Sequence, residues 1–222
     1  MPWAINRQGN NTAFGTNTVT VTLDGAIAEG DFVTAEIVMD SPVAPVSAIP
    51  GFSRQVTGSG ATGGTMYIDT LTLQNAPAGA TSFVVTVNQT CNVIAAYIRS
   101  ETGIATNAAL IGVVLNTQIA PGTGADAVTS TDINAIAQPA ALIGFSFNQA
   151  GQDVPNAGTG FTSRAGVWDF GGGVCARPED RRLTVTGNAA ATFTALTGAD
   201  TYVSVGLILL EGTGASTAWL RA

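Results

Sequence analysis

Apolar and small polar residues alternate along much of this chain with a period of two, which is typical of half-buried β-strands. In 16–23, Val19, Val21 and Leu23 share one face, and threonines occupy the other. The same pattern predicts further strands at 31–39, 64–73, 81–87, 92–99, 140–147, 161–169, 181–186, 190–196 and 201–210, and it loosens after Glu101. No segment has a convincing apolar period of 3.6 residues, so we expect little or no helix.

The second half of the chain repeats the strand pattern of the first. The segments GDFVTAEIVM, GFSRQVTG, TSFVVTVN and NVIAAYIRSE are followed later by PAALIGFSFN, GTGFTSRAGVWDF, ATFTALTG and TYVSVGLILLEG. Neither half alone offers enough strands for two good sheets. We therefore predict a single all-β domain at 16–212, an antiparallel, jelly-roll-like β-sandwich with a candidate seam near 117–138. Residues 1–15 and 213–222 are predicted to form terminal arms.

Two local patterns refine this prediction. In 31–39, four alternate apolar residues from Val33 to Met39 lie on one face and Glu36 lies on the other, so we expect Glu36 to be solvated. The proline-rich segment 41–51 cannot supply a central strand, because each proline removes a ladder donor. It is expected to be an edge or a crossing loop.

The composition limits the chemistry that the chain can perform. The 222 residues include no histidine and no lysine, which excludes histidine bases and ligands and lysine Schiff bases. Apolar residues make up 45% and charged residues only 10%, so threonine, serine, asparagine and glutamine must build most of the surface. Surfaces of this kind suit neighbouring proteins as well as water.

The charge and the apolar runs limit the partners. A net charge of −7 and a pI near 4.3 argue against nucleic acid, and the basic cluster Arg177, Arg181 and Arg182 is interrupted by two acids. The start of the chain lacks the features of a signal peptide. The most apolar run, Val203–Leu210, is far shorter than a membrane-spanning helix. We expect synthesis in a cytoplasm and no membrane anchor.

Motifs that could carry catalysis are weak. GSGATG at 58–63 fits the dinucleotide fingerprint, but a strand follows it where the fingerprint needs a helix. A glycosidase would need two facing carboxylates. Nothing in the sequence pairs the candidates, so they are interpreted as solubilising acids near turns: Asp69, Glu101, Asp132 and Asp169. The sequence therefore predicts no enzyme, no cofactor and no metal site. Cys91 and Cys175 are either two free thiols or a disulfide.

A few large side chains are candidates for contacts with other molecules. Near the termini, large apolar groups are costly in a free monomer and useful in an assembly. The candidate interface residues are Trp3, Ile5, Trp219 and Leu220. Aromatic rings with a polar edge also stack on sugars, and Trp168 and Tyr67 are the candidates for that alternative.

The order of the strands and their residues resembles the jelly-roll-like β-sandwich virion proteins of tailed bacteriophages. The resemblance is carried by TVTVTLDGAIAEGDFVTAEIVM, APAGATSFVVTVNQT, NVIAAYIRSETGIATN, ALIGFSFN, GTGFTSR and TYVSVGLILLEG, and it spans most of 16–212. It implies a structural or adhesive protein without a cofactor. Because the chain lacks heptads and fibrous repeats, it looks more like a capsid decoration (cement) or head-spike protein than a fibre.

This resemblance implies a location in the virion and contacts with the major capsid protein or other virion proteins, with a homo-oligomer expected. The alternative is a carbohydrate-binding receptor-recognition module of a phage tail or spike. Neither hypothesis needs nucleic acid or a membrane.

Overall fold

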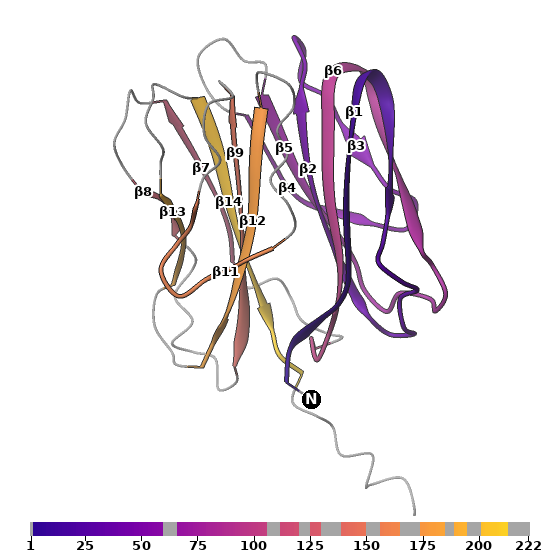
Figure 1. Ribbon diagram of the computed structural model, residues 1–222, viewed down its shortest axis with the longest axis vertical. Coiled ribbons are helices and arrows are strands. Elements are labelled where there is room, and N and C mark those ends of the chain that lie inside the picture. Colours follow the sequence, from indigo (N-terminus) through magenta and orange to yellow (C-terminus); the bar gives the residue numbers. More distant parts are fainter. Residues whose placement is uncertain are drawn as a thin grey trace, which may run out of the picture.

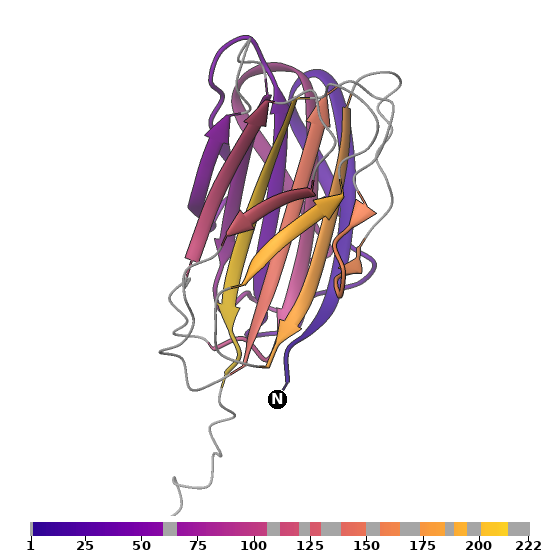
Figure 2. The ribbon, with the colours of Figure 1, turned by 90° about the vertical axis from the view of Figure 1, so that its left-hand side faces the viewer.

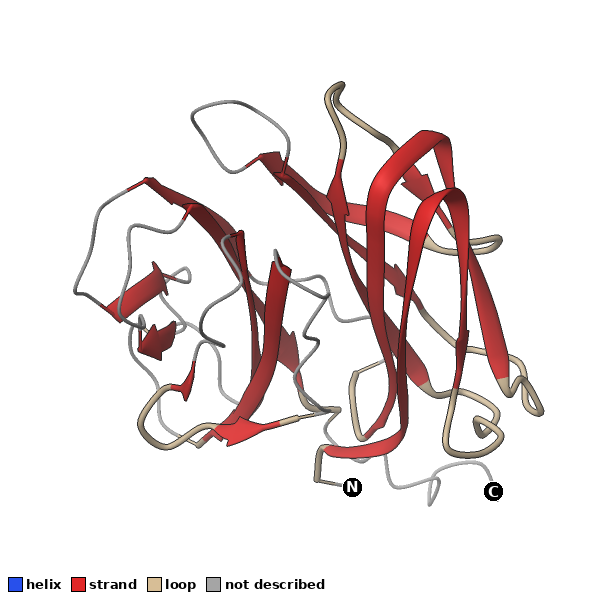
Figure 3. Ribbon diagram, turned by 45° about the horizontal axis from the view of Figure 1, so that its top comes forward, coloured by secondary structure: helices blue, strands red, loops and turns tan. Residues whose placement is uncertain are grey.

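The computed structural model describes residues 2–59, 66–105, 112–119, 125–129, 139–149, 156–164, 174–184, 189–194 and 201–212. Every regular element in these ranges is a β-strand, and none is a helix (Figure 3). All of the strand pairs are antiparallel. The predicted all-β class and the antiparallel β-sandwich are confirmed.

The first half of the chain forms one six-stranded sheet, the first sheet. Its strands lie in the order β1–β6–β2–β5–β4, and β3 pairs with β6 beside this path. The strands are β1 (Ala4–Thr22), β2 (Phe32–Asp40), β3 (Ser47–Ala48), β4 (Ser53–Ser59), β5 (Met66–Leu73) and β6 (Ser82–Thr102). With 19 and 21 residues, β1 and β6 are far longer than an ordinary strand.

The long β1–β6 pair bends back over the rest of its own sheet. At the bend Gly15 has φ +59°, a conformation that glycine adopts without strain. The two arms of β1 then approach each other so closely that a Cβ on Gly9 would lie 2.1 Å from the carbonyl oxygen of Thr22. Glycine is therefore required at this crossing.

The bend makes two layers out of one sheet. We call 16–22 of β1, 82–91 of β6 and β3 the outer layer, and the remainder of the first sheet the inner layer. Buried side chains fill the space between the two layers, among them Val19, Val21, Val85, Val87, Ile37, Met39, Leu71, Ile94 and Ile98. The first half of the chain thus has a core of its own.

The second half forms two further sheets. The second sheet has the order β11–β12–β9–β14–β7, and the third has the order β10–β13–β8. Their strands are β7 (Gly112–Ile119), β8 (Ala125–Thr129), β9 (Ala140–Gln149), β10 (Asn156–Ala157), β11 (Thr162–Ser163), β12 (Val174–Leu183), β13 (Ala190–Thr194) and β14 (Thr201–Leu210). In Figure 2, β8 and β13 cross in front of the second sheet. Apolar side chains pack between the two sheets, including Leu142, Leu183, Ala189 and Ile208.

The two halves have the same strand order. The path β1–β6–β2–β5–β4 corresponds to β7–β14–β9–β12–β11, and the outer layer β1–β6–β3 corresponds to β8–β13–β10. The registers agree as well: Gly9 lies opposite Ile98, and Gly112 lies opposite Ile208. The repeated strand pattern of the sequence therefore reflects a repeated fold, in which one bent sheet of the first half is matched by two separate sheets of the second.

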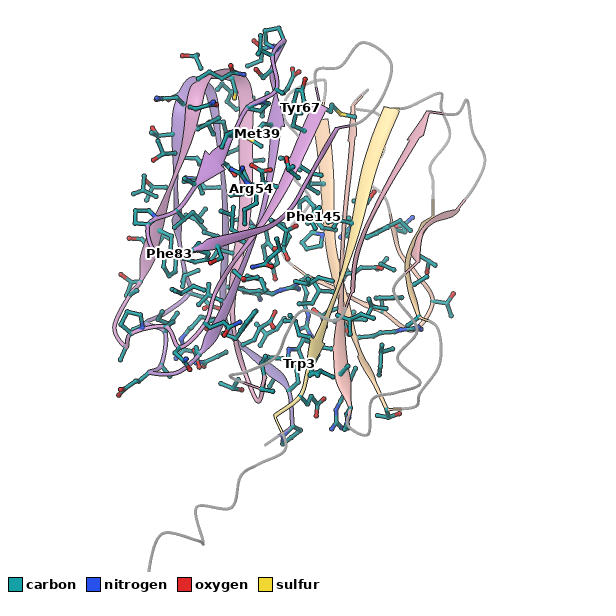
Figure 4. The ribbon with its side chains drawn as sticks, turned by 180° about the vertical axis from the view of Figure 1, so that it is seen from behind. Trp3, Met39, Arg54, Tyr67, Phe83 and Phe145 are labelled. Atoms are coloured by element: carbon teal, nitrogen blue, oxygen red, sulfur yellow. The ribbon has the colours of Figure 1, made fainter. Side chains whose placement is uncertain are left out.

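The halves pack side by side through the inner layer and the second sheet (Figure 1). Val38 and Ala95 of the first half share one cluster with Phe145 and Val205 of the second. These are equivalent pairs of neighbouring residues, since Val38 lies opposite Ala95 and Phe145 opposite Val205. Figure 4 shows Phe145 between the halves. We call this contact the seam; it has the self-matching character of an isologous interface.

Most predicted strands are present, with shifted ends. The strand predicted at 201–210 coincides with β14, and the one at 31–39 differs from β2 by one residue at each end. The strands predicted at 81–87 and 92–99 are parts of the single strand β6, which continues through the polar residues Asn88, Gln89 and Thr90 that separate them in the sequence. Within 41–51 only the two-residue β3 forms, as the prolines led us to expect.

Two predicted strands were placed wrongly or only in part. The prediction at 181–186 is wrong, because the strand there is β12, which begins at Val174 and ends at Leu183. Of the strand predicted at 161–169, only β11 falls within the described residues. The segment 117–138, predicted from the sequence as the boundary between the halves along the chain, includes β8 and the end of β7. The rest of that range lies outside the described residues.

Candidate functional site

A cluster of charged side chains lies buried in the seam. Arg99 on β6 is its centre: Nη2 lies 3.0 Å from Glu36 Oε1 of β2, and Nε lies 2.8 Å from Glu101 Oε1. Arg99 Nε also donates to the hydroxyl of Thr34 at 3.0 Å. The side chains of Arg99 and Glu101 have no exposed surface, and that of Glu36 is 2% exposed. The group is thus closed to solvent.

The second half completes the cluster. Asp180 of β12 lies 3.6 Å from Arg99 Nη1 and accepts two hydrogen bonds from Arg164, at 2.7 and 3.0 Å. Arg164 follows β11 and is the one partly exposed member. Arg99 and Asp180 therefore join the inner layer to the second sheet by a direct ionic contact across the seam.

Burial dominates the electrostatics of this cluster. Desolvation raises the pKa of Glu101 to about 7, although the Arg99 charge opposes the rise and the Glu36 charge adds to it. Desolvation also raises the pKa of Glu36, again against the attraction of Arg99. Three facing carboxylates keep Arg99 charged by raising its pKa, despite its own burial. One oxygen of each glutamate, Glu36 Oε2 and Glu101 Oε2, is buried without a hydrogen-bond partner.

The expectation that Glu36 is solvated is wrong. The alternation correctly placed Glu36 on the face opposite Val33, Ile37 and Met39, but that face is covered by the second half of the protein. A strand with both faces covered buries every residue, and burial of a glutamate then requires a partner of opposite charge, here Arg99.

The interpretation of Asp69 and Glu101 as solubilising acids is also wrong. Both are buried, and Asp69 Oδ2 accepts hydrogen bonds from the amide and the hydroxyl of Ser47, at 2.9 and 2.6 Å. Asp69 thereby fixes β3 to the core of the first half. Asp132 and Asp169 lie outside the described residues.

The equivalent carboxylate of the second half has a similar role. Glu179 of β12 accepts a hydrogen bond from the amide of Gly158 at 2.8 Å and so fixes the segment after β10. Burial raises its pKa to about 7. Within the described ranges no group of three or more histidine, cysteine or acidic residues could hold a metal ion. The buried carboxylates thus hold segments of the fold together.

A second candidate is the exposed face of the outer layer. The alternation that buries Val19, Val21 and Val85 turns their neighbours toward solvent. The exposed residues of its three strand segments include Thr18, Thr20, Thr22, Ala48, Ser82, Val84, Thr86, Asn88 and Thr90. None of these side chains is charged. We call this surface the neutral face.

Large apolar side chains border the neutral face. Val84 is 47% exposed, and Val46 and Val43, beside β3, are 45% and 61% exposed. Side-chain amides hold this border in place: Asn88 accepts from the amide of Val46 at 2.9 Å, and Gln89 donates to Ser41 at 2.6 Å. The face is therefore a fixed sheet surface rather than a loose loop.

The candidate contact residues have different places. Trp3 is half-buried beside Glu101 and packs on the Phe32 cluster, and Ile5 is half-buried in β1. Tyr67 packs against the core of the first half (Figure 4). Trp168, Trp219 and Leu220 lie outside the described residues. Of these candidates, the described ones, Trp3, Ile5 and Tyr67, lie away from the neutral face.

Cys91 is a free, buried thiol at the bend of β6. Desolvation raises its pKa, so the thiolate is suppressed at neutral pH. The backbone of Cys175 lies in β12.

Sequence reasoning missed Arg99, Asp180 and Arg164 as a group. They come from three strands or loops and meet only in the folded protein. One signal was available: Arg99 directly follows the apolar run VIAAYI of a predicted strand, where an unpaired buried charge would be very costly.

Comparison with known proteins identifies no relative: no family model, no curated protein and no solved structure matches this chain. Among the described residues there is no helix of the length and apolarity needed to cross a membrane.

Proposed function

We propose that this chain is a non-enzymatic structural protein of a phage virion, a capsid decoration (cement) or head-spike protein that binds the capsid shell. The observation that carries the proposal is the neutral face. The chain has a net charge of −7, and removal of a charged group from water is costly in free energy. An extended sheet surface without any charged side chain is therefore well suited to be buried against a partner.

The chemistry of the neutral face suits a protein partner. Threonine and serine hydroxyls both donate and accept hydrogen bonds, so they pair with backbone or side-chain groups of either kind. Val84, Val46 and Val43 add apolar area beside them. A hydrogen-bonded sheet surface also loses less conformational entropy than a loop when it is covered. The partner of this proposal is the major capsid protein or a neighbouring virion protein.

Point substitutions on the neutral face test the proposal. Thr20→Glu and Val84→Glu each place a carboxylate in the middle of the face, on neighbouring positions of β1 and β6. Co-sedimentation with shells assembled without this protein is expected to show saturable binding of the wild type. Each variant should bind about tenfold or more weakly, because one unpaired buried charge costs more than the roughly 1.4 kcal/mol of a tenfold change.

Thr57→Glu is the matched control. Thr57 is exposed on β4 in the inner layer, away from the neutral face, so this variant has the same added charge and should bind like the wild type. Equal binding by the wild type, Thr20→Glu and Val84→Glu would refute the neutral face as the contact. A wild type that ignores shells but binds an immobilised glycan would refute shell binding and favour the receptor-recognition alternative.

A further inference from the structure

The seam cluster has an excess of negative charge. Its three carboxylates, Glu36, Glu101 and Asp180, face two guanidinium groups, Arg99 and Arg164. Asp180 is matched by the two hydrogen bonds from Arg164. Arg99 is therefore the one described cation that pairs with both glutamates. It can compensate only one of their two negative charges.

An uncompensated charge is not tolerated in a site without solvent. Glu36 and Glu101 each direct one oxygen at Arg99, and the other oxygen of each is buried outside hydrogen-bond geometry. The Trp3 side chain beside Glu101 favours the ionised form and so opposes the rise in its pKa, but its indole is neutral and does not compensate the charge. Protonation of one carboxyl group removes the excess charge, whereas a buried carboxylate without a cation is costly. The two groups interact through the same arginine, so their protons belong to the pair rather than to either residue.

We propose that Glu36 and Glu101 share a single proton in the folded protein, and that this proton makes the strength of the contact between the two halves depend on pH. Loss of the proton at higher pH leaves two carboxylates on one arginine and weakens the contact between the inner layer and the second sheet. The inference concerns the joint between the halves and is independent of shell binding.

Among the described residues, the surroundings of the cluster supply no other compensating cation. From β6, the phenol of Tyr97 lies under Arg99, with the guanidinium carbon 5.6 Å from the ring centre, and it donates to Gln8. The facing part of the second sheet is apolar, with Ile143, Leu207 and Leu209. Arg182 is occupied by Glu211 through a two-point ion pair. Of the described charged residues of the second half, Asp180 and Arg164 are therefore the two that contribute to the charge of the cluster.

The direction of the effect follows from the raised pKa of Glu101. A carboxyl group with a pKa of about 7 in the folded protein and 4.5 in the unfolded chain stabilises the fold fully below pH 4.5, and this stability is lost as the pH rises through 7. For this group alone, the folding equilibrium constant should fall about 30-fold between pH 5.5 and 8.5.

Isosteric variants of the full chain test the proposal. Glu101→Gln and Glu36→Gln each mimic the protonated group and leave Arg99 with one carboxylate. Urea unfolding from pH 5.5 to 8.5 should show a flatter pH dependence for both variants. For Glu101→Gln the expected reduction is up to about the 30-fold factor. Hydrogen exchange, expressed as protection factors, should show that β2 and β6 lose protection at pH 8.5 in the wild type but not in the variants.

Two control variants distinguish the effect of the Glu36–Glu101 proton from the effects of other titrating groups. Glu179→Gln removes another carboxyl group with a raised pKa, inside the second half, and should leave the exchange behaviour of β2 and β6 unchanged. Glu29→Gln, on an exposed turn, should change neither measurement.

Infrared spectroscopy provides a test that does not depend on the stability of the variants. Because Glu179 also has a raised pKa, the background for this test is Glu179→Gln. In that variant a protonated carboxyl band should be present near pH 6, should decline as the pH rises through 7, and should be lost when Glu101→Gln is added. A Glu179→Gln variant with no such band, or Glu36→Gln and Glu101→Gln variants that keep the full pH dependence of the wild type, would overturn the shared proton.

Discussion

Replacement of Arg99 by leucine should be among the most damaging single substitutions in this protein. Arg99 contacts Glu36, Glu101 and Asp180, and its side chain has no exposed surface. Removal of one partner from a buried ionic group costs about 3–5 kcal/mol, because the remaining charges lose their compensation. No other cation of the described part of the chain pairs with Glu36 or Glu101, which places Arg99→Leu toward the upper end of this range.

The second half of the protein shows how the loss can be reversed. At the positions equivalent to Arg99 and Glu36 it has Leu209 and Ile143, which are buried in an apolar cluster of the seam. We therefore expect the triple variant Arg99→Leu, Glu36→Ile, Glu101→Gln to regain most of the lost stability. Replacement of a buried ionic group by apolar residues of similar volume is often neutral or stabilising by about 1–4 kcal/mol.

Urea unfolding at pH 7, followed by circular dichroism, measures both effects. The triple variant should be at least about 2 kcal/mol more stable than Arg99→Leu, since the residues interact and their effects are not additive. The reasoning would be refuted by a loss below about 1 kcal/mol for Arg99→Leu, or by a triple variant that is no more stable than the single one.

Three further outcomes are expected. Phe145→Ala should lower the free energy of unfolding by about 3–5 kcal/mol, because Phe145 is fully buried where the halves meet; thermal or urea unfolding measures this, and a loss below about 1 kcal/mol would contradict the described packing. Gly9→Ala should cost about 1–3 kcal/mol or more, since its Cβ would overlap the Thr22 carbonyl at 2.1 Å; a neutral result would mean that the two arms of β1 do not cross there. In a Cys175→Ser background, Cys91 should react with a thiol reagent at pH 8 only after denaturation, because it is buried and its pKa is raised; rapid reaction of the native protein would contradict its burial.

Alternation of apolar and polar residues predicted the strands better than it predicted their surroundings. It located β2 and β14 closely, because each alternates or remains apolar over a full strand length. It could not indicate how many faces of a strand are covered. Glu36 was therefore assigned to solvent, although the second sheet covers it.

Charge misled the prediction at β12. The segment RPEDRR reads as polar with a proline, so the predicted strand began at 181 instead of 174. In the structure Asp180 meets Arg99 and Arg164, and Glu179 meets the Gly158 amide. These partners lie 16 to 81 residues away in sequence, a separation at which no local pattern reports contact.

The sequence predicted which residue types build the surface, but it did not predict that they gather on one neutral face. A low fraction of charged residues indicated a surface of threonine, serine and asparagine, but the bend at Gly15 decides that these residues share one exposed layer. The bend depends on a positive φ at one glycine and on a register shift, and neither is distinguishable in a sequence with 27 glycines.

The division of the fold at the middle of the chain has a consequence for its biosynthesis. The first sheet needs nothing beyond Thr102, which pairs with Ala4, so a ribosome has made every strand of the first half before any strand of the second. Domains generally fold as units during synthesis, from the N-terminus onward. The face that carries Glu36, Arg99 and Glu101 would then be exposed to water at first, with its charges hydrated. It would be buried only after β9, β12 and β14 have emerged from the ribosome. The order of synthesis thus allows a buried ionic group to be assembled in water and closed afterwards.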